Sequence, residues 1–199
     1  LCRRRLPELV PESLVWGEEE GYSAPGPGGL WVVDPIDGTS NFAYGSPLWG
    51  VSIALIQGAD IIVGAVALPD FGEVYSAALG QGTYMNDQRL KPIPSGEIRP
   101  EELVSYCDMT LTTFGPERLP GKMRYAGAFV IEGVWVLKQH FRGLISYKAN
   151  VYDVAAIVCC AKELDADVRM ADGTPFRVDE LVAARCIEKP FVVFPRESG

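Results

Sequence analysis

The sequence predicts a protein of mixed α and β structure, and three observations support this prediction. Residues 31–90 contain apolar runs separated by turn residues, with connections short enough for an antiparallel meander of strands. Apolar residues recur at nearly helical spacing over 128–141 and again over 151–164. The runs LISYK and KPFVVF, near the second of these segments and at the end of the chain, predict two further strands.

In chain order, the meander is predicted from the runs LWVV, WGVSIALIQ, DIIVGAVALP, GEVYSAAL and GTYM, with Gly, Pro, Asn and Asp marking the turns. Proline and glycine become frequent between residues 92 and 121, which predicts a boundary between sub-domains at 1–95 and 96–199. The first helix is expected to be amphipathic. Asn150 is expected to cap the second helix, VYDVAAIVCCAKEL, whose Val154, Ile157 and Val158 lie on one apolar stripe.

Composition and charge exclude several classes of protein. The 199 residues are 48% apolar, without a run of eighteen apolar residues and without an apolar segment behind the basic N-terminal cluster, so no membrane association is expected. Five cysteines, an odd number without a C-x-x-C pair, favour reduced thiols and a cytoplasmic location. A net charge of −8 without a stripe of Lys and Arg argues against nucleic acid. An anionic substrate would therefore need bound cations or helix N-termini.

The segment WVVDPIDGTSNF, residues 31–42, carries the strongest chemical signal. Asp34 follows an apolar strand, Pro35 fixes the backbone, and Asp37 is expected one tight turn later. Both carboxylates and the carbonyl of Ile36 could then converge on one cation, and oxygen ligands favour Mg²⁺ or Mn²⁺. Behind them, GTSNF can open a short helix in which Gly38 lets an anion approach the backbone. The alternative is a turn whose two acids lie in solvent.

Two other segments add acids that are weak signals by themselves. Glu18 belongs to the run GEEE at 17–20, which follows the apolar SLVW and could equally be a solvated surface. Asp153 falls in the first turn of the second predicted helix, where it could simply complement the helix dipole.

Taken together, GEEE, DPIDGTSNF and the downstream YDVAA resemble the inositol monophosphatase family of metal-dependent, lithium-sensitive phosphatases. DPIDGTSNF matches the first family signature at every position, and YDVAA at 152–156 matches the second with tyrosine in place of tryptophan. The segment GQGTYMNDQRL also resembles its counterpart in the family, and the similarity covers nearly the whole chain.

The resemblance implies a layered αβαβα sandwich and Mg²⁺-dependent hydrolysis of a small phosphate monoester, with inositol monophosphate or a related polyol phosphate as substrate. It implies two or three Mg²⁺ ions, with Mn²⁺ as a substitute, held by Glu18, Asp34, Ile36, Asp37 and Asp153. By the same resemblance Glu18, Thr39 and Asp37 are the catalytic residues. The expected substrate-binding residues are Gly38, Thr39, Ser40, Ala128 and Phe129.

The chain also departs from the family's pattern. Only sixteen residues precede Gly17, so the N-terminal helical layer is expected to be short or missing, and ELDADVRM replaces a glycine-rich segment. Ser146, Tyr147 and Lys148 stand where relatives often carry an acid that binds a substrate hydroxyl, so the identity of the substrate stays open.

The alternative functions are a fructose-bisphosphatase, a histidinol-phosphatase, a nucleotide 3′-phosphatase or, in another class, a non-catalytic metal-binding subunit. Dimers are common among similar proteins, so a homodimer is the assembly to consider.

Overall fold

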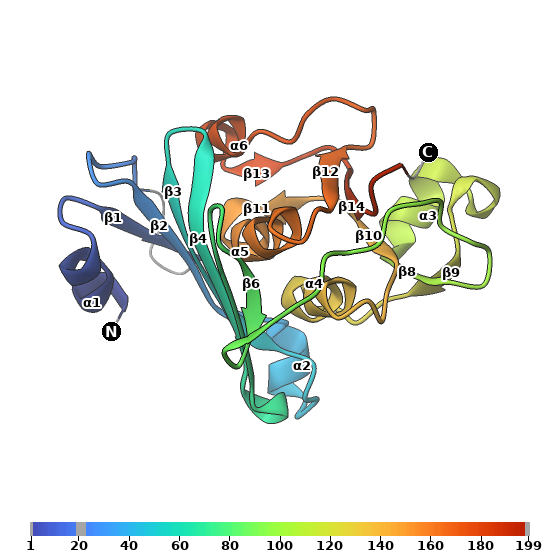
Figure 1. The fold of residues 1–199 in the computed structure, drawn as a ribbon, viewed down its shortest axis with the longest axis horizontal. Coiled ribbons are helices and arrows are strands. Elements are labelled where there is room, and N and C mark those ends of the chain that lie inside the picture. The colour runs from blue at the N-terminus through green and yellow to red at the C-terminus, as the bar shows by residue number, and fades with distance from the viewer. Residues whose placement is uncertain (1, 19–22, 198–199) are drawn as a thin grey trace.

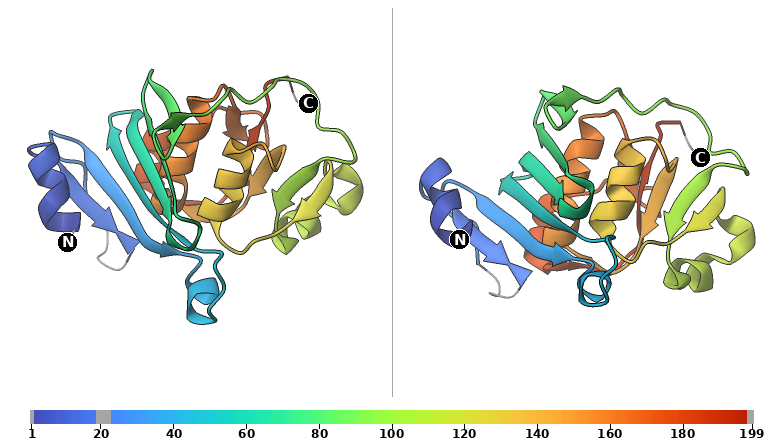
Figure 2. Two further views of the ribbon diagram at one scale, coloured as in Figure 1. Left: turned by 60° about the horizontal axis from the view of Figure 1, so that its bottom comes forward. Right: turned by 90° about the horizontal axis from the view of Figure 1, so that it is seen from below.

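The computed structural model describes residues 2–18 and 23–197, and in it the chain forms stacked layers of helix and sheet (Figure 1). In order, the layers are helix α1, a first sheet, helices α4 and α5, a second sheet, and helix α3. Figure 2 shows the same layers from two other directions. This arrangement confirms the predicted α/β sandwich. Glu19 and Glu20, which accompany Glu18 in the sequence, lie outside the described residues.

The helices of the described residues are short, and the α-helices have these bounds: α1 Cys2–Leu9, α2 Thr39–Ala43, α3 Asp108–Phe114, α4 Phe129–Leu137, α5 Val151–Lys162 and α6 Val178–Ala184. The first sheet contains, within the described residues, β1 Leu14–Gly17, β2 Leu30–Asp37, β3 Gly50–Gln57, β4 Asp60–Leu68, β5 Glu73–Ala78, β6 Gly82–Met85 and β7 Gln88–Arg89. The second sheet likewise contains β8 Leu103–Tyr106, β9 Lys122–Arg124, β10 Gly143–Ser146, β12 Asp167–Met170 and β14 Phe191–Phe194. The short strands β11 Ala149–Asn150 and β13 Cys186–Ile187 pair with each other.

The first sheet follows chain order from β1 to β7, and every neighbouring pair from β2 onward is antiparallel, as the meander prediction required. Strand β1 adds to its edge in parallel with β2. Helix α5 crosses β4 at Gly64, where an added Cβ would stand 2.7 Å from the carbonyl oxygen of Ala156. A glycine is therefore needed there for the helix to approach the strand this closely.

Helices α4 and α5 lie between the two sheets, and their burial differs from the prediction. Helix α4 was expected to be amphipathic, yet Val130, Ile131, Val134 and Val136 are all buried and only its ends reach solvent. Helix α5 is buried in the same way, Cys159 and Cys160 included. The amphipathic expectation is wrong because each helix has a sheet on both sides, so no face of it is left for water.

The second sheet has the order β12-β14-β10-β8-β9. Strands β8, β9 and β10 run parallel, while β14 is antiparallel to both β10 and β12. The final strand predicted from KPFVVF is therefore an interior strand, and all four residues of β14 are buried. Residues from the 98–119 region, including Leu111 and Leu119, pack against the outer face of this sheet.

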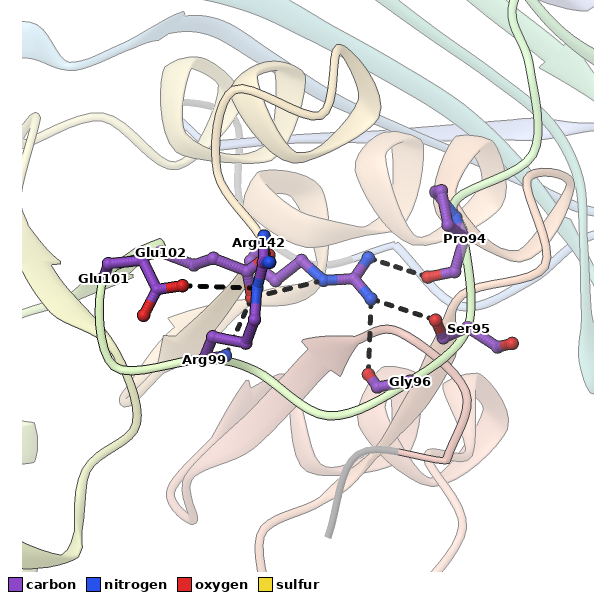
Figure 3. A network of polar contacts seen from close by, with 7 residues as sticks. All are labelled: Pro94, Ser95, Gly96, Arg99, Glu101, Glu102 and Arg142. Carbon is purple, nitrogen blue, oxygen red and sulfur yellow. Dashed lines mark hydrogen bonds and ion pairs between the residues drawn. The ribbon is translucent and has the colours of Figure 1, made fainter.

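The segment that joins the two sheets, residues 90–102, has no regular secondary structure but is held firmly (Figure 3). The guanidinium of Arg142 donates hydrogen bonds to the carbonyl oxygens of Pro94, Ser95 and Gly96 at 2.7, 3.1 and 3.3 Å. It also forms an ion pair of 3.6 Å with Glu102. The predicted sub-domain boundary at 95/96 falls in this segment and stays a prediction.

In the part of the chain that the structure describes, no helix is long and apolar enough to cross a membrane. All five cysteines are free. Asp165 has a left-handed φ of 64° in the segment that replaces the expected glycines, and it forms an ion pair with Arg196.

Candidate active site

The two acids of DPID lie on one strand, at a point where its pairing shifts. Strand β2 continues through Asp37, with Asp34 opposite Ser52 and Asp37 opposite Gly50 on β3. In a regular strand, residues three apart point to opposite faces. Here three steps along β2 match two steps along β3, so one extra residue brings both aspartates to the same face. The expected tight turn is wrong, because β2 continues through Asp37 and a β-bulge brings the two aspartates to one face instead.

Each of these two carboxylates is oriented by a backbone N–H group. Asp34 is buried, and its Oδ1 accepts a hydrogen bond from the Ile36 N–H at 2.9 Å. Asp37 Oδ2 accepts the N–H of Val130, in the first turn of α4, at 2.5 Å. The Thr39 hydroxyl donates a hydrogen bond to the Ile36 carbonyl oxygen at 3.1 Å. This bond orients the carbonyl group that was predicted to be a metal ligand.

Asp153 comes from α5, more than a hundred residues downstream, and the first turn of that helix is tied to the same place in the sheet. The hydroxyl of Ser52, the cross-strand partner of Asp34, donates to the Tyr152 carbonyl at 3.0 Å. Asp153 Oδ2 accepts the Asn150 backbone N–H at 2.9 Å, and Asn150 is the N-cap of α5, as predicted. The charge of Asp153 raises the pKa of Asp34, so the two carboxyl groups are neighbours.

Burial and mutual repulsion both act on these acids. Burial raises the pKa of Asp34, and the neighbouring charges of Asp37, Asp153 and Glu18 raise it further. Burial also raises the pKa of Asp37 to about 7, against two backbone hydrogen bonds that lower it. The pKa of Asp153 is raised mainly by burial, and Glu18 adds to the rise. Glu18 itself is exposed directly after β1, close enough for its charge to act on two of the aspartates.

The acids are neighbours, but they are not drawn onto a single point. Among the described residues, no three acidic, cysteine or histidine side chains converge as a ready metal site. The physical reason is that like charges repel, and each of Asp34, Asp37 and Asp153 turns one oxygen toward a backbone donor. Their role as metal ligands therefore stays a prediction.

Gly38 brings the acid-bearing strand against the start of α4. Its φ is 86°, a left-handed conformation that favours glycine, and it precedes α2 as the N-cap. A Cβ built on it would stand 2.7 Å from the Cβ of Ala128. Thr39 and Ser40 follow on the exposed first turn of α2. The expected phosphate contacts of these residues are untested.

A cavity of about 160 Å³ opens beside the acids. It brings Asp37 and Asp153 together with the predicted substrate residues Ala128 and Phe129. The remaining described residues of its wall are Cys107, Tyr125, Gly127, Glu132, Ile145, Ser146, Tyr147, Lys148 and Ala149.

Two residues that hold the cavity wall were not predicted. The Asn41 side-chain amide donates to the carbonyl oxygens of Leu48 and Ala126 at 2.7 and 2.8 Å, which ties the DPIDGTSNF segment to the 126–129 loop. The buried Glu132 carboxylate accepts the Ala126 and Gly127 N–H groups at 2.9 and 3.3 Å. Burial raises the pKa of Glu132. The only signal for Glu132 was an acid inside an otherwise apolar helical run.

Comparison with known proteins places the chain in a family. A model described as the inositol monophosphatase family matches residues 1–190. The chain belongs to this family. A relative from Aquifex aeolicus (strain VF5), named a fructose-1,6-bisphosphatase/inositol-1-monophosphatase, is 29% identical over 95% of this chain and 76% of its own length. The predicted class of hydrolase, acting on phosphate monoesters, is confirmed at the level of the family.

Solved structures of family members share the fold. The crystal structure of inositol-monophosphate-bound SaIMPase-II has a TM-score of 0.84 and 24% identity, covering 98% of this chain and 76% of that one. An IMPase/NADP phosphatase complexed with Mg²⁺ and phosphate has a TM-score of 0.82 and 21% identity, covering 98% and 73%. At this identity the likeness establishes the fold of the inositol monophosphatase family.

Proposed function

We propose that this chain hydrolyses a small phosphate monoester in a Mg²⁺-dependent reaction, with inositol monophosphate or a related polyol phosphate as substrate. The supporting observation is the group of Asp34, Asp37 and Asp153, which two separate segments bring together beside a cavity. Three carboxyl groups with raised pKa values in one place are unfavourable unless protons or cations offset their charge. Oxygen donors are the ligands that Mg²⁺ and Mn²⁺ prefer, so the donor set fits these ions.

In this proposal Asp34, Asp37, Asp153, Glu18 and the Ile36 carbonyl hold two or three ions. When bound, such ions lower the pKa of water and offset the charge of a phosphate group. The named relatives support this assignment, because one is a bisphosphatase and inositol monophosphatase and a structural neighbour holds Mg²⁺ with phosphate.

The chain's own residues then bind and orient the reactants. Glu18 lies close to Asp34 and Asp153 and is exposed, so it can accept a proton from the attacking water, with the Thr39 hydroxyl as a second contact. The N–H groups of Gly38, Thr39 and Ser40 donate to phosphate oxygens. Ala128 and Phe129, which line the cavity, lie against the alcohol part of the substrate.

Phosphate release from a panel of monoesters tests this proposal. The panel contains inositol 1-phosphate, fructose 1,6-bisphosphate, histidinol phosphate and a 3′-phosphorylated nucleotide, each with Mg²⁺, with a chelator, and with Mg²⁺ plus Li⁺. We expect turnover that requires Mg²⁺ and falls with Li⁺. Absence of metal-dependent release from every compound would favour the non-catalytic metal-binding subunit. Gel filtration of the same sample tests the expected homodimer, and fractionation of the source cells tests the cytoplasmic location.

A further inference from the structure

The charges around the cavity are distributed unevenly. Asp37 and Asp153, from β2 and α5, belong to the acidic group, and among the described residues that line the cavity Lys148 is the only basic one. Within the described part of the chain, Lys148 forms no ion pair, so its ammonium group lies more than 4.0 Å from either carboxylate. The cavity therefore has the two aspartates in one part of its wall and the positive charge of Lys148 in another.

The backbone fixes where this positive charge is presented. Strand β10 ends at Ser146 and β11 begins at Ala149, so Tyr147 and Lys148 form a two-residue connection. Ala149 is held by pairing with Ile187, and Lys148 has a left-handed φ of 54°, which is uncommon for a residue with a side chain. The side chain of Lys148 is exposed, but its Cα is anchored on both sides.

Lys148 has two neutral hydrogen-bond donors beside it on the same wall. Ser146 and Tyr147, which both carry hydroxyl groups, line the cavity together with Lys148. A neutral sugar hydroxyl can accept a hydrogen bond from a lysine, but an anionic oxygen gains the attraction between opposite charges in addition to the donors. The wall is therefore suited to an anion.

We propose that Lys148 binds a second anionic group of the substrate, so that this chain favours phosphate monoesters whose far end carries another phosphate or a carboxylate. The inference rests on the proposed function, because it places the reacting phosphate at the aspartates. A substrate of this kind would reach from the acidic group to Lys148 across the cavity. An alternative is that Lys148 contacts the reacting phosphate itself.

Kinetics on two classes of substrate separate these alternatives. We expect Lys148→Met to lower kcat/KM for fructose 1,6-bisphosphate by about tenfold, a typical loss for a charge-assisted contact. The same variant should lower kcat/KM for glycerol 2-phosphate, whose far end is neutral, by less than about twofold. Lys148→Arg should restore most of the activity on the bisphosphate. Lys91→Met, at an exposed residue outside the cavity wall, controls for the change in net charge.

A loss of similar size on both substrates would assign Lys148 to the reacting phosphate, and no loss on either would remove it from the site. A binding measurement keeps this test independent of turnover, because phosphonates lack the ester bond that is cleaved. Calorimetric titration in Mg²⁺ should show that Lys148→Met weakens binding of 3-phosphonopropionate but not of 3-hydroxypropylphosphonate. If wild-type protein binds both but releases no phosphate from any ester, the proposed function fails while the role of Lys148 is still decided.

Discussion

Asp37 joins the strand that carries the acids to the helix behind the cavity. Its Oδ2 accepts the Val130 N–H at the start of α4. The charges of Asp153 and Glu132 also act on the Asp37 carboxyl group and raise its pKa. Asparagine keeps an oxygen that can accept this hydrogen bond but removes the charge. The substitution of Asp37 by asparagine therefore distinguishes the role of the carboxylate in the fold from its role in the reaction.

We expect Asp37→Asn to reduce phosphate release by more than about 100-fold, because several kcal/mol of interaction with cations and phosphate would be lost. The fold should remain, and thermal unfolding in chelator should occur at the same or a higher temperature, since one repulsive charge is gone. Phosphate assays and circular dichroism on one preparation measure both effects. Activity within a few-fold of wild type would remove Asp37 from the catalytic residues.

The raised pKa of Asp37 also predicts how stability depends on pH in the presence of a chelator. The folded chain binds the proton more tightly than the unfolded chain, because the pKa rises from 3.8 to about 7. The stabilisation that this proton provides is complete below pH 3.8 and is lost as the pH rises through about 7. We expect the unfolding free energy of wild type, minus that of Asp37→Asn, to fall across this range in urea titrations. A flat difference would contradict the raised pKa.

At the scale of elements, the contact between α2 and α4 depends on one position without a side chain. Gly38 precedes α2 with a φ of 86°. Ala128 precedes α4, and its buried side chain lies directly against Gly38. Any Cβ at residue 38 would meet both Ala128 and the Leu48 carbonyl oxygen, the latter at 2.9 Å. The two segments that frame the acids can therefore approach only with glycine here.

Gly38→Ala should lower the free energy of unfolding by about 2–4 kcal/mol, the sum of left-handed strain and overpacking. Gly45→Ala is the matched control, because Gly45 has a φ of 73° but nothing within 4 Å of an added Cβ. The control should lose only about 1 kcal/mol from strain. Urea denaturation followed by tryptophan fluorescence measures both variants. Equal losses would show that the contact with Ala128 relaxes without cost.

At the scale of the whole molecule, the two sheets are connected by a segment that one arginine fastens. Arg142 follows α4 directly before β10, and its guanidinium contacts three carbonyl groups of the connecting segment (Figure 3). A further bond joins the Ile93 N–H to the Leu164 carbonyl after α5 at 2.8 Å. The segment is therefore bound to residues that follow α4 and α5, as well as being joined to both sheets.

We expect Arg142→Ala to lower the unfolding free energy by about 1.5–3 kcal/mol, because the carbonyl groups of the connecting segment and the partly buried Glu102 would lose a charged hydrogen-bonding partner. Arg99→Ala is the control within the same network, since the Arg99 side chain is 68% exposed although it too pairs with Glu102. An exposed pair of this kind contributes at most about 1 kcal/mol. Chemical denaturation of both variants gives the comparison. A loss at Arg142 no larger than at Arg99 would mean that the segment is held by other contacts.

Several features of the fold could be predicted because they depend on local pattern. The apolar runs between turn residues predicted β2 to β6, and Asn150 marked the start of α5 where the structure has it. The signature from Asp34 to Phe42 identified the family that the comparison confirms. Glu132 and Asn41 could not be predicted in the same way, because their partners are backbone groups of the 126–127 loop whose position only packing determines.

By itself, the sequence determined the strands β2 to β6, β10 and β14, the helices α4 and α5, and the acids that are candidates for chemistry. Tertiary structure decided two matters that local pattern does not contain. The pairing of β2 with β3 placed Asp34 and Asp37 on one face through a bulge, and the sheets on both sides buried most of α4 and α5. The reason is that strand register and the burial of a helix depend on partners distant in the chain, whereas propensity and spacing report only on neighbours.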